Sequence, residues 1–305
     1  MQIAIIRFFD SLANPALDFI GEFFTFFGED TVFILAIAFI LWCGSKKKGF
    51  AIYSTLLTSL VAMSILKALV RAPRPFEVLQ DIKGKRVQTA TGYSFPSGHT
   101  TGAASFYSSL AITMRKRWLS IACGFLILMV AVSRMYLGVH WPLDVAAGLI
   151  LGVGITIVTY DLFLKLYDDR VRLVRFAMAI GIGGTLGAVL LALLIPAGLV
   201  DATAFTDPMK LLSLAGGGCL GFTLDQVRLH YATTGTLKVK AFRYVFGVMV
   251  LMLVQGSKPF LPDHLFFSFV RYAVTGFWAT GLYPMLGMQL RLWEGEPLFG
   301  KEEVV

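Results

Sequence analysis

The sequence predicts an all-α integral membrane protein, a helical bundle with about nine transmembrane helices and an N-terminal interfacial amphipathic helix. Of its 305 residues, 56% are hydrophobic and only 15% are charged, and the mean hydropathy is +0.72. Soluble domains carry roughly 25% charged residues, so this composition is typical of a chain embedded in a bilayer. The net charge of +8 comes from short basic clusters between apolar segments. That distribution favours membrane lipids as partners and argues against a nucleic-acid-binding surface.

Residues 1–28 are predicted to lie in the membrane interface. Four polar residues recur at every fourth position along one side of this segment: Asp10, Asn14, Asp18 and Glu22. A single polar stripe on an otherwise apolar helix favours an interfacial position over a spanning one. Asn14-Pro15 would break the segment into two short helices. Because Arg7 and Asp10 interrupt the first apolar run, we do not expect a cleaved signal peptide.

Nine apolar segments follow, separated by basic clusters or polar loops. They comprise residues 31–44, 49–70, 99–114, 118–132, 143–164, 176–200, 209–224, 241–255 and 265–288. A spanning helix usually needs about 20 residues, so the shorter segments depend on their polar ends to reach the interface. We therefore divide the chain into the interfacial region 1–28, a catalytic core over 29–170 and additional C-terminal transmembrane helices over 171–305. Glycine clusters at 181–187 and 216–221 predict close packing between helices.

The basic residues predict how the chain is oriented. If all nine segments cross, the basic clusters share one side: 46–48, 115–117, 165–175, 228–243 and the C-terminal tail. The positive-inside rule makes that side cytoplasmic, together with the C-terminus. The loops 71–96 and 133–141 then face outward. The first of these loops is itself rich in cations, which suggests that it carries charge for chemistry. We expect a bacterial plasma membrane, since no organelle retrieval signal is recognised.

The first candidate cluster lies at the outer end of the second apolar segment. In the stretch KALVRAPRP, Lys67 lies near the end of the segment and Arg74 follows after six residues. An ammonium group within a membrane segment is costly and by default suggests a functional site. Taken alone, Lys67 could instead extend to the interface, and Arg71 could simply anchor the helix end.

The second cluster, Pro96-Ser97-Gly98-His99, directly precedes the third apolar segment. Serine and glycine at the start of a helix leave backbone N–H groups free, and the helix dipole adds positive potential, so this is an anion site. His99 stands where it could pass a proton to a bound anion. The tetrapeptide alone is equally consistent with a helix N-cap followed by a surface histidine.

The third cluster lies in SRMYLGVHWPLD, from Ser133 to Asp144. Pro142 suits the first turn of a helix, so His140 and Asp144 can meet on one face. A carboxylate bonded to one imidazole nitrogen fixes the tautomer and leaves the other nitrogen free as a nucleophile. Arg134 adds a planar fork suited to phosphate oxygens. Each residue alone could be structural, but the three clusters together predict phosphoryl transfer without a metal.

These clusters resemble the three signatures of the type 2 phosphatidic acid phosphatase superfamily in composition, order and spacing. The matching segments are Lys67-x6-Arg74-Pro75, Pro96-Ser97-Gly98-His99 and Ser133-Arg134-x5-His140-x3-Asp144. The resemblance implies that His140 attacks phosphorus to form a phosphohistidine, that Asp144 orients it, and that His99 protonates the leaving oxygen. It also implies a set of groups that bind the phosphoryl oxygens: Lys67, Arg74, Arg134, Ser97 and the backbone N–H of Gly98. No metal and no cofactor are expected.

The overall layout resembles, more loosely, the subgroup that contains sphingosine-1-phosphate phosphatases and glucose-6-phosphatase. We expect hydrolysis of a lipid phosphate or diphosphate at the outer leaflet, with undecaprenyl diphosphate, phosphatidic acid, phosphatidylglycerophosphate and sphingoid phosphates all open as substrates. A soluble sugar phosphate is the enzymatic alternative. A transporter would distribute polar residues through the depth of several spans, whereas here they gather at one end. The sequence leaves the oligomeric state open.

Overall fold

The computed structural model describes residues 1–295, and within that range every regular element longer than an isolated β-bridge is helical. The prediction of an all-α protein is therefore confirmed. The nine predicted apolar segments are each helical over most of their length. Their helices are α3 (Asp30–Phe39, extended by a π-helical turn over Ile40–Gly44), α4 (Lys46–Val70), α6 (Gly98–Met114), α7 (Arg117–Tyr136), α8 (Pro142–Asp168), α9 (Arg170–Leu194), α10 (Ala202–Leu224), α11 (Leu237–Gly256), and α12 with α13 (Leu265–Phe277 and Tyr283–Gln289).

The expected number of spans is not confirmed. Within residues 1–295, four helices are long and apolar enough to cross a membrane, namely α4, α7, α8 and α9, or up to five if α2 (Pro15–Phe26) and α3 count as one bent span. Helix α6 has only 17 residues, below the roughly 20 that cross a hydrocarbon core. The predicted segment 265–288 is divided by a π-helical turn at Trp278–Leu282 into pieces of 13 and 7 residues.

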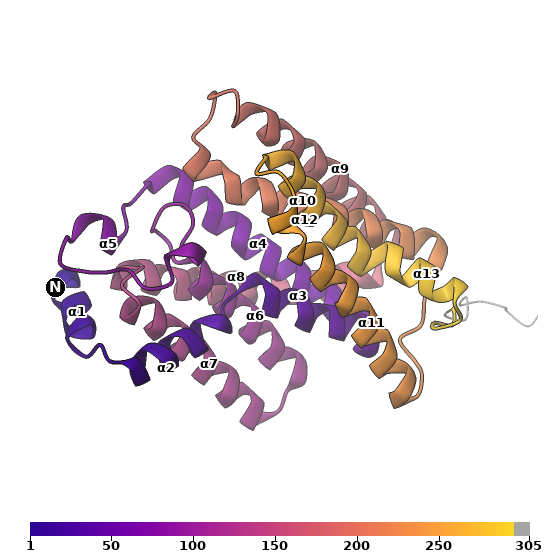
Figure 1. The fold of residues 1–305 in the computed structure, drawn as a ribbon. Coiled ribbons are helices and arrows are strands. Elements are labelled where there is room, and N and C mark those ends of the chain that lie inside the picture. The colour runs from indigo at the N-terminus through magenta and orange to yellow at the C-terminus, as the bar shows by residue number, and fades with distance from the viewer. Residues whose placement is uncertain (296–305) are drawn as a thin grey trace, which may run out of the picture.

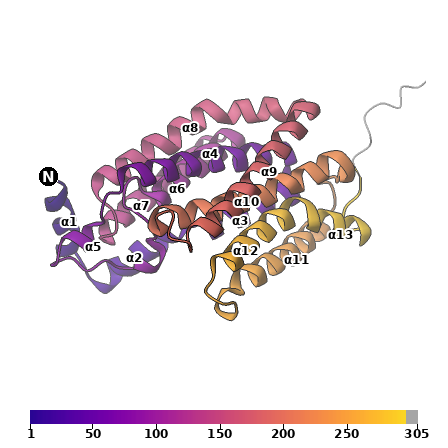
Figure 2. The same cartoon turned by 90° about the horizontal axis from the view of Figure 1, so that it is seen from above.

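The first half of the chain forms one bundle. Helix α4 packs against α6 and α8, and α6 also packs against α7. Figure 2 shows α4, α6, α7 and α8 running together on one side of the molecule. Glycines let α8 approach α6 closely, since a Cβ atom on Gly152 would lie 2.5 Å from the carbonyl oxygen of Thr101. This contact brings the start of α8 against the start of α6, where the second and third motifs lie.

The second half packs around α10, which contacts α9, α12 and, across the junction between the halves, α4. Figure 2 shows these C-terminal helices beside the first bundle. A Cβ atom on Gly217 would lie 2.0 Å from the carbonyl oxygen of Ala273, and one on Gly184 would lie 3.1 Å from that of Leu212. The prediction that the glycine clusters serve close helix packing is confirmed for the cluster at 216–221 and for Gly181 and Gly184, but not for Gly183, which has no neighbour among the described residues within 4 Å of a Cβ position.

The N-terminal segment forms two short helices, as expected, with α1 over Gln2–Ser11 and α2 beginning at Pro15. The Asn14 side chain caps α2 by accepting hydrogen bonds from Ala16 N and Leu17 N at 3.1 and 3.0 Å. Helix α2 packs against α7, and Figure 1 shows α1, α2 and the short α5 (Pro75–Val78) gathered at one end of the molecule. Asp18 on α2 forms an ion pair with Lys85 of the loop that precedes α6.

The two ends of α4 differ in chemistry. Lys46, at its start, forms a buried ion pair with Asp225 at 3.1 Å, and Lys47 pairs with Asp168 at 2.6 Å. Lys67 lies 21 residues further along, roughly 32 Å away in an α-helix, which is close to the thickness of a bilayer core. The basic clusters at 46–48 and 165–175 thus share the end of the bundle opposite the three motifs.

Candidate active site

The second motif begins α6 and is joined directly to the third. Ser97 is the N-cap of α6, and its hydroxyl oxygen accepts hydrogen bonds from Thr100 N at 3.4 Å and Thr100 Oγ1 at 2.9 Å. Its backbone N–H donates to the carbonyl oxygen of Asp144 at 3.0 Å. Gly148 makes this approach possible, since a Cβ atom there would lie 2.9 Å from the Ser97 carbonyl oxygen.

His140 lies between α7 and α8 and is 1% exposed. Its Nδ1 atom is 3.4 Å from Asp144 Oδ2, and that oxygen also accepts hydrogen bonds from Ser94 Oγ at 2.5 Å and Trp141 N at 2.8 Å. An acceptor held beside Nδ1 favours the tautomer protonated there and leaves Nε2 with its lone pair. Burial lowers the pKa of His140 well below its ordinary value, and nearby cations, Arg74 first among them, lower it further. The neutral imidazole needed for nucleophilic attack is thus favoured.

Arg74 lies on the open side of that imidazole. Its Nη1 atom is 3.2 Å from His140 Nε2 and donates to the carbonyl oxygen of Val139 at 2.9 Å. The guanidinium is 2% exposed, and it also donates to the carbonyl oxygens of Thr91 and Gly92 at 2.7 and 3.0 Å. The Lys67 ammonium donates to the neighbouring carbonyl of Tyr93. These two cations therefore hold the loop 91–93 against the nucleophile.

Other donors at the site have no partner among residues 1–295. Arg134 is fully buried, and its Nη1 donates to Thr25 Oγ1 of α2 at 2.6 Å. Within residues 1–295, its Nε and Nη2 atoms and the Nε2 atom of His99 are buried without a hydrogen-bond partner. Leaving a charged donor buried and unpaired is costly, so such atoms call for an explanation such as a bound anion.

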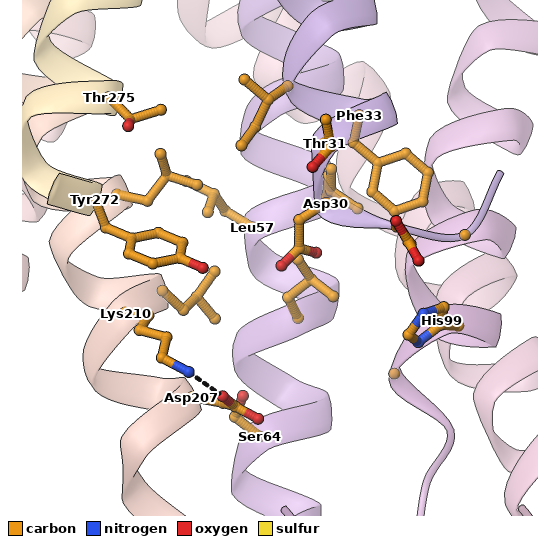
Figure 3. Close-up of a pocket in the computed structure, with 18 of the residues that line it drawn as sticks. Asp30, Thr31, Phe33, Leu57, Ser64, His99, Asp207, Lys210, Tyr272 and Thr275 are labelled. Carbon is orange, nitrogen blue, oxygen red and sulfur yellow. Dashed lines mark hydrogen bonds and ion pairs between the residues drawn. The ribbon is translucent and has the colours of Figure 1, made fainter. Parts of the chain in front are cut away.

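A cavity of about 400 Å³ joins most of the predicted residues. Five of them line it: Lys67, Arg74, Gly98, His99 and His140. The other three predicted residues do not line it: Asp144 lies behind His140, the hydroxyl of Ser97 caps α6, and Arg134 is fully buried beside Thr25. Figure 3 shows His99 on one side of this space, with residues of α10 and α12 on the other. The structure thus gathers the catalytic and cationic residues predicted from the three motifs at one end of the bundle.

Two contributors were missed in the sequence. Ser94 lies close before the second motif, and its hydroxyl donates to Asp144, but a serine in a loop carries no pattern that marks it. Thr25 belongs to the predicted interfacial segment and contacts Arg134, which no local signal reveals. Both act by orienting a residue that the motifs do identify.

Comparison with known proteins agrees with the motifs. The PAP2 superfamily matches residues 47–168, which include every motif residue. A second family, the transmembrane extension of PAP2 superfamily phosphatases, matches residues 209–296. An undecaprenyl-diphosphatase of Sulfolobus acidocaldarius is 30% identical over 141 residues, covering 46% of this chain and 68% of the relative. The chain belongs to the PAP2 superfamily.

Further relatives within this superfamily are phosphatases by name. A probable sphingosine-1-phosphate phosphatase of Dictyostelium discoideum is 30% identical over 175 residues, covering 53% of this chain and 42% of the relative. Phosphatidylglycerophosphatase B of Bacillus subtilis is 31% identical over 94 residues, covering 28% of this chain and 44% of the relative. By their names, these relatives are phosphatases that act on different lipids.

Proposed function

We propose that this chain is a metal-independent membrane phosphatase that hydrolyses a lipid phosphate or diphosphate at the extracytoplasmic face through a phosphohistidine intermediate. The observation that carries the proposal is the buried His140, held by Asp144 at Nδ1 and facing Arg74 at Nε2. A bilayer location is supported by the match to the transmembrane extension and by the apolar helices. The extracytoplasmic side is supported by the basic clusters at the opposite end of α4.

The reaction would proceed in two steps. In the first, the Nε2 lone pair of His140 attacks phosphorus, the bond from phosphorus to the leaving oxygen breaks, and His99 gives that oxygen a proton. In the second, His99 accepts a proton from water, the water oxygen attacks the phosphohistidine, and inorganic phosphate leaves with His140 restored. The phosphoryl group would replace the contact between Arg74 and His140 Nε2, and the unpaired donors of Arg134 would stabilise its charge.

The test uses the purified full-length chain in detergent or liposomes with EDTA present. We expect phosphate release from at least one member of a panel of lipid phosphates and diphosphates, with a sugar phosphate as the comparison for the alternative substrate class. His140→Ala should lower activity at least about 10³-fold, as for other covalent nucleophiles. His230→Asn is the matched control, because His230 lies near Arg170 at the basic end and has a positive φ that asparagine tolerates.

A labelled substrate adds a direct measurement of the intermediate. When the phosphoryl group of the substrate is labelled, the wild-type chain should retain label that is labile in acid and stable in alkali. The His140→Ala chain should retain none. Full activity in His140→Ala would exclude this mechanism, and strict dependence on added magnesium would exclude metal independence.

A further inference from the structure

The loop 91–93 lies between the catalytic core and the start of α10. Its backbone carbonyls bind two cations of the first motif. Arg74 donates to the carbonyl oxygens of Thr91 and Gly92 at 2.7 and 3.0 Å, and the Lys67 ammonium donates to the carbonyl of the following residue. A guanidinium bound to two consecutive carbonyls is fixed in orientation, because its donors form a rigid fork. The position of the loop therefore sets the position of both cations.

The side chains of the same loop bind α10. Thr91 Oγ1 donates to Asp207 Oδ2 at 2.5 Å, and the Tyr93 hydroxyl donates to Asp201 Oδ2 at 2.7 Å. Asp201 is the N-cap residue of α10, and Asp207 lies within that helix. Both carboxylates lie outside the stretch 47–168 that matches the PAP2 superfamily. The loop that binds the cations is thus itself bound by the second half of the chain.

Gly92 allows the loop to approach α10 closely. Its φ is +65°, a left-handed conformation that glycine adopts without the cost of a Cβ atom. A Cβ atom there would lie 3.2 Å from the carbonyl oxygen of Thr203 and 3.6 Å from Asp207 Oδ2. The bonds on either side of Gly92 therefore belong to one continuous contact between the loop and the first turns of α10.

Each of the two carboxylates is also held within α10. Asp207 Oδ1 accepts a hydrogen bond from Lys210 Nζ at 2.9 Å, the bond that is dashed in Figure 3. Asp201 Oδ1 accepts a hydrogen bond from Thr203 N at 2.9 Å. One oxygen of each carboxylate thus fixes its orientation on the helix, and the other oxygen accepts from the loop. Acceptors that are held in this way lose little freedom when they bind the loop.

We infer that Asp201 and Asp207 are positioning residues, which act through the loop 91–93 on the two cations bound to it. Arg74 Nη1 lies 3.2 Å from His140 Nε2, so a shift of the loop would change the geometry at the attacking atom. The inference deepens the proposed function and rests on it. It gives the second half of the chain a part in ordering the groups that bind the phosphoryl oxygens.

The test removes one hydroxyl from the loop and measures kcat and KM for the lipid phosphate that the wild-type chain hydrolyses best. Thr91→Val removes the donor to Asp207 and keeps the backbone carbonyl that binds Arg74. We expect kcat to fall about tenfold with KM nearly unchanged, because a hydrogen bond to a charged group contributes about this factor and the loss is one of orientation. Thr91→Ser retains a hydroxyl and should restore kcat. Thr206→Val is the matched control, since its hydroxyl donates to the carbonyl of Ala202 in the same helix.

A double-mutant cycle tests whether Thr91 and Asp207 act as a pair. Asp207→Ala should lower kcat at least as much as Thr91→Val, because it also removes the partner of Lys210. The double variant should be no slower than Asp207→Ala, since the shared hydrogen bond is lost only once. Tyr93→Phe removes the bond to Asp201 and should lower kcat in the same way. Losses that multiply in the double variant would overturn the inference.

The other results that would overturn the inference differ from those that would overturn the proposed function. Unchanged kcat in both Thr91→Val and Tyr93→Phe would overturn the inference alone. A lower thermal midpoint with unchanged kcat would do the same, because the bonds would then serve only the fold. Since Thr91 and Asp207 line the cavity, a higher KM with unchanged kcat would show that they contact substrate and do not position the cations. If the wild-type chain hydrolyses no phosphate of the panel, or if His140→Ala is fully active, the proposed function fails and the inference fails with it.

Discussion

The two halves of the molecule build one cavity by different means. In the first half, the proposed catalytic groups have polar partners, as His140 has in Asp144 and Arg74. In the C-terminal half, the wall is placed by backbone contacts at glycines, such as Gly217 against the carbonyl of Ala273. The first half therefore contributes through the chemistry of its side chains. The second half contributes mainly through the close approach of its helices, which sets the position of the cavity wall.

This difference predicts different kinetic effects. Changes to core donors should lower kcat, because those donors stabilise charge that develops in the transition state. Changes to the packing of α10 and α12 should instead lower stability and weaken substrate binding, because they move a wall of the cavity. A packing change in α10 or α12 that lowered kcat alone would contradict this expectation. It would show that the two halves affect one another more strongly than their contacts indicate.

Arg134→Lys should have the largest effect among changes that leave both histidines in place. It keeps the positive charge but removes the planar fork, whose Nε and Nη2 atoms are buried and unpaired in the described residues. We expect kcat/KM for lipid phosphate to fall about 10²–10³-fold, as when one donor to a developing oxyanion is lost. Arg172→Lys, at a side chain that is 79% exposed, should change it little. A loss below about threefold in Arg134→Lys would remove this arginine from the phosphoryl site.

Gly217→Ala tests the second half. A Cβ atom there would lie 2.0 Å from a backbone oxygen of α12, so the helices must separate, and overpacking of this kind costs about 1–3 kcal/mol. Gly183→Ala is the control, since no atom of the described residues lies within 4 Å of the Cβ position on Gly183. Alanine favours a helix over glycine by about 1 kcal/mol, so the control should be neutral or slightly stabilising. Thermal unfolding in detergent measures both, and equal midpoints would contradict the packing account.

The proximity of the proposed catalytic residues could be predicted from the sequence because the three motifs each combine polar residue types with a fixed spacing. Lys67, His99 and His140 lie in three separate motifs, and each is a polar group at the edge of an apolar segment. The helical segments were also predictable, since apolar runs bounded by basic clusters show where a helix begins and ends. The number of spans was not, because a π-helical turn such as Trp278–Leu282 leaves no mark in composition.

The far wall of the cavity could not be predicted. Asp30 and Tyr272 line the same space although they are 242 residues apart in the chain. They share it only because α10 packs against both α4 and α12, and no pattern in the sequence shows which faces of these helices meet. Which apolar face meets which is decided by shape, through glycines and close backbone contacts.

Ser94→Ala should have the smallest effect. It tests whether the groups that bond to Asp144 act only by orienting the nucleophile. The change removes the hydroxyl that donates to Asp144 Oδ2 at 2.5 Å, while Trp141 N still donates to the same oxygen. We expect kcat to fall about tenfold with KM unchanged, because a hydrogen bond to a charged group contributes about 1.5 kcal/mol or more and Ser94 orients the nucleophile without lining the cavity. Ser109→Ala is the matched control, since that buried hydroxyl has no partner among residues 1–295. A rise in KM for Ser94→Ala would instead place Ser94 in contact with the substrate, and the core would then select substrate as well as orient its nucleophile.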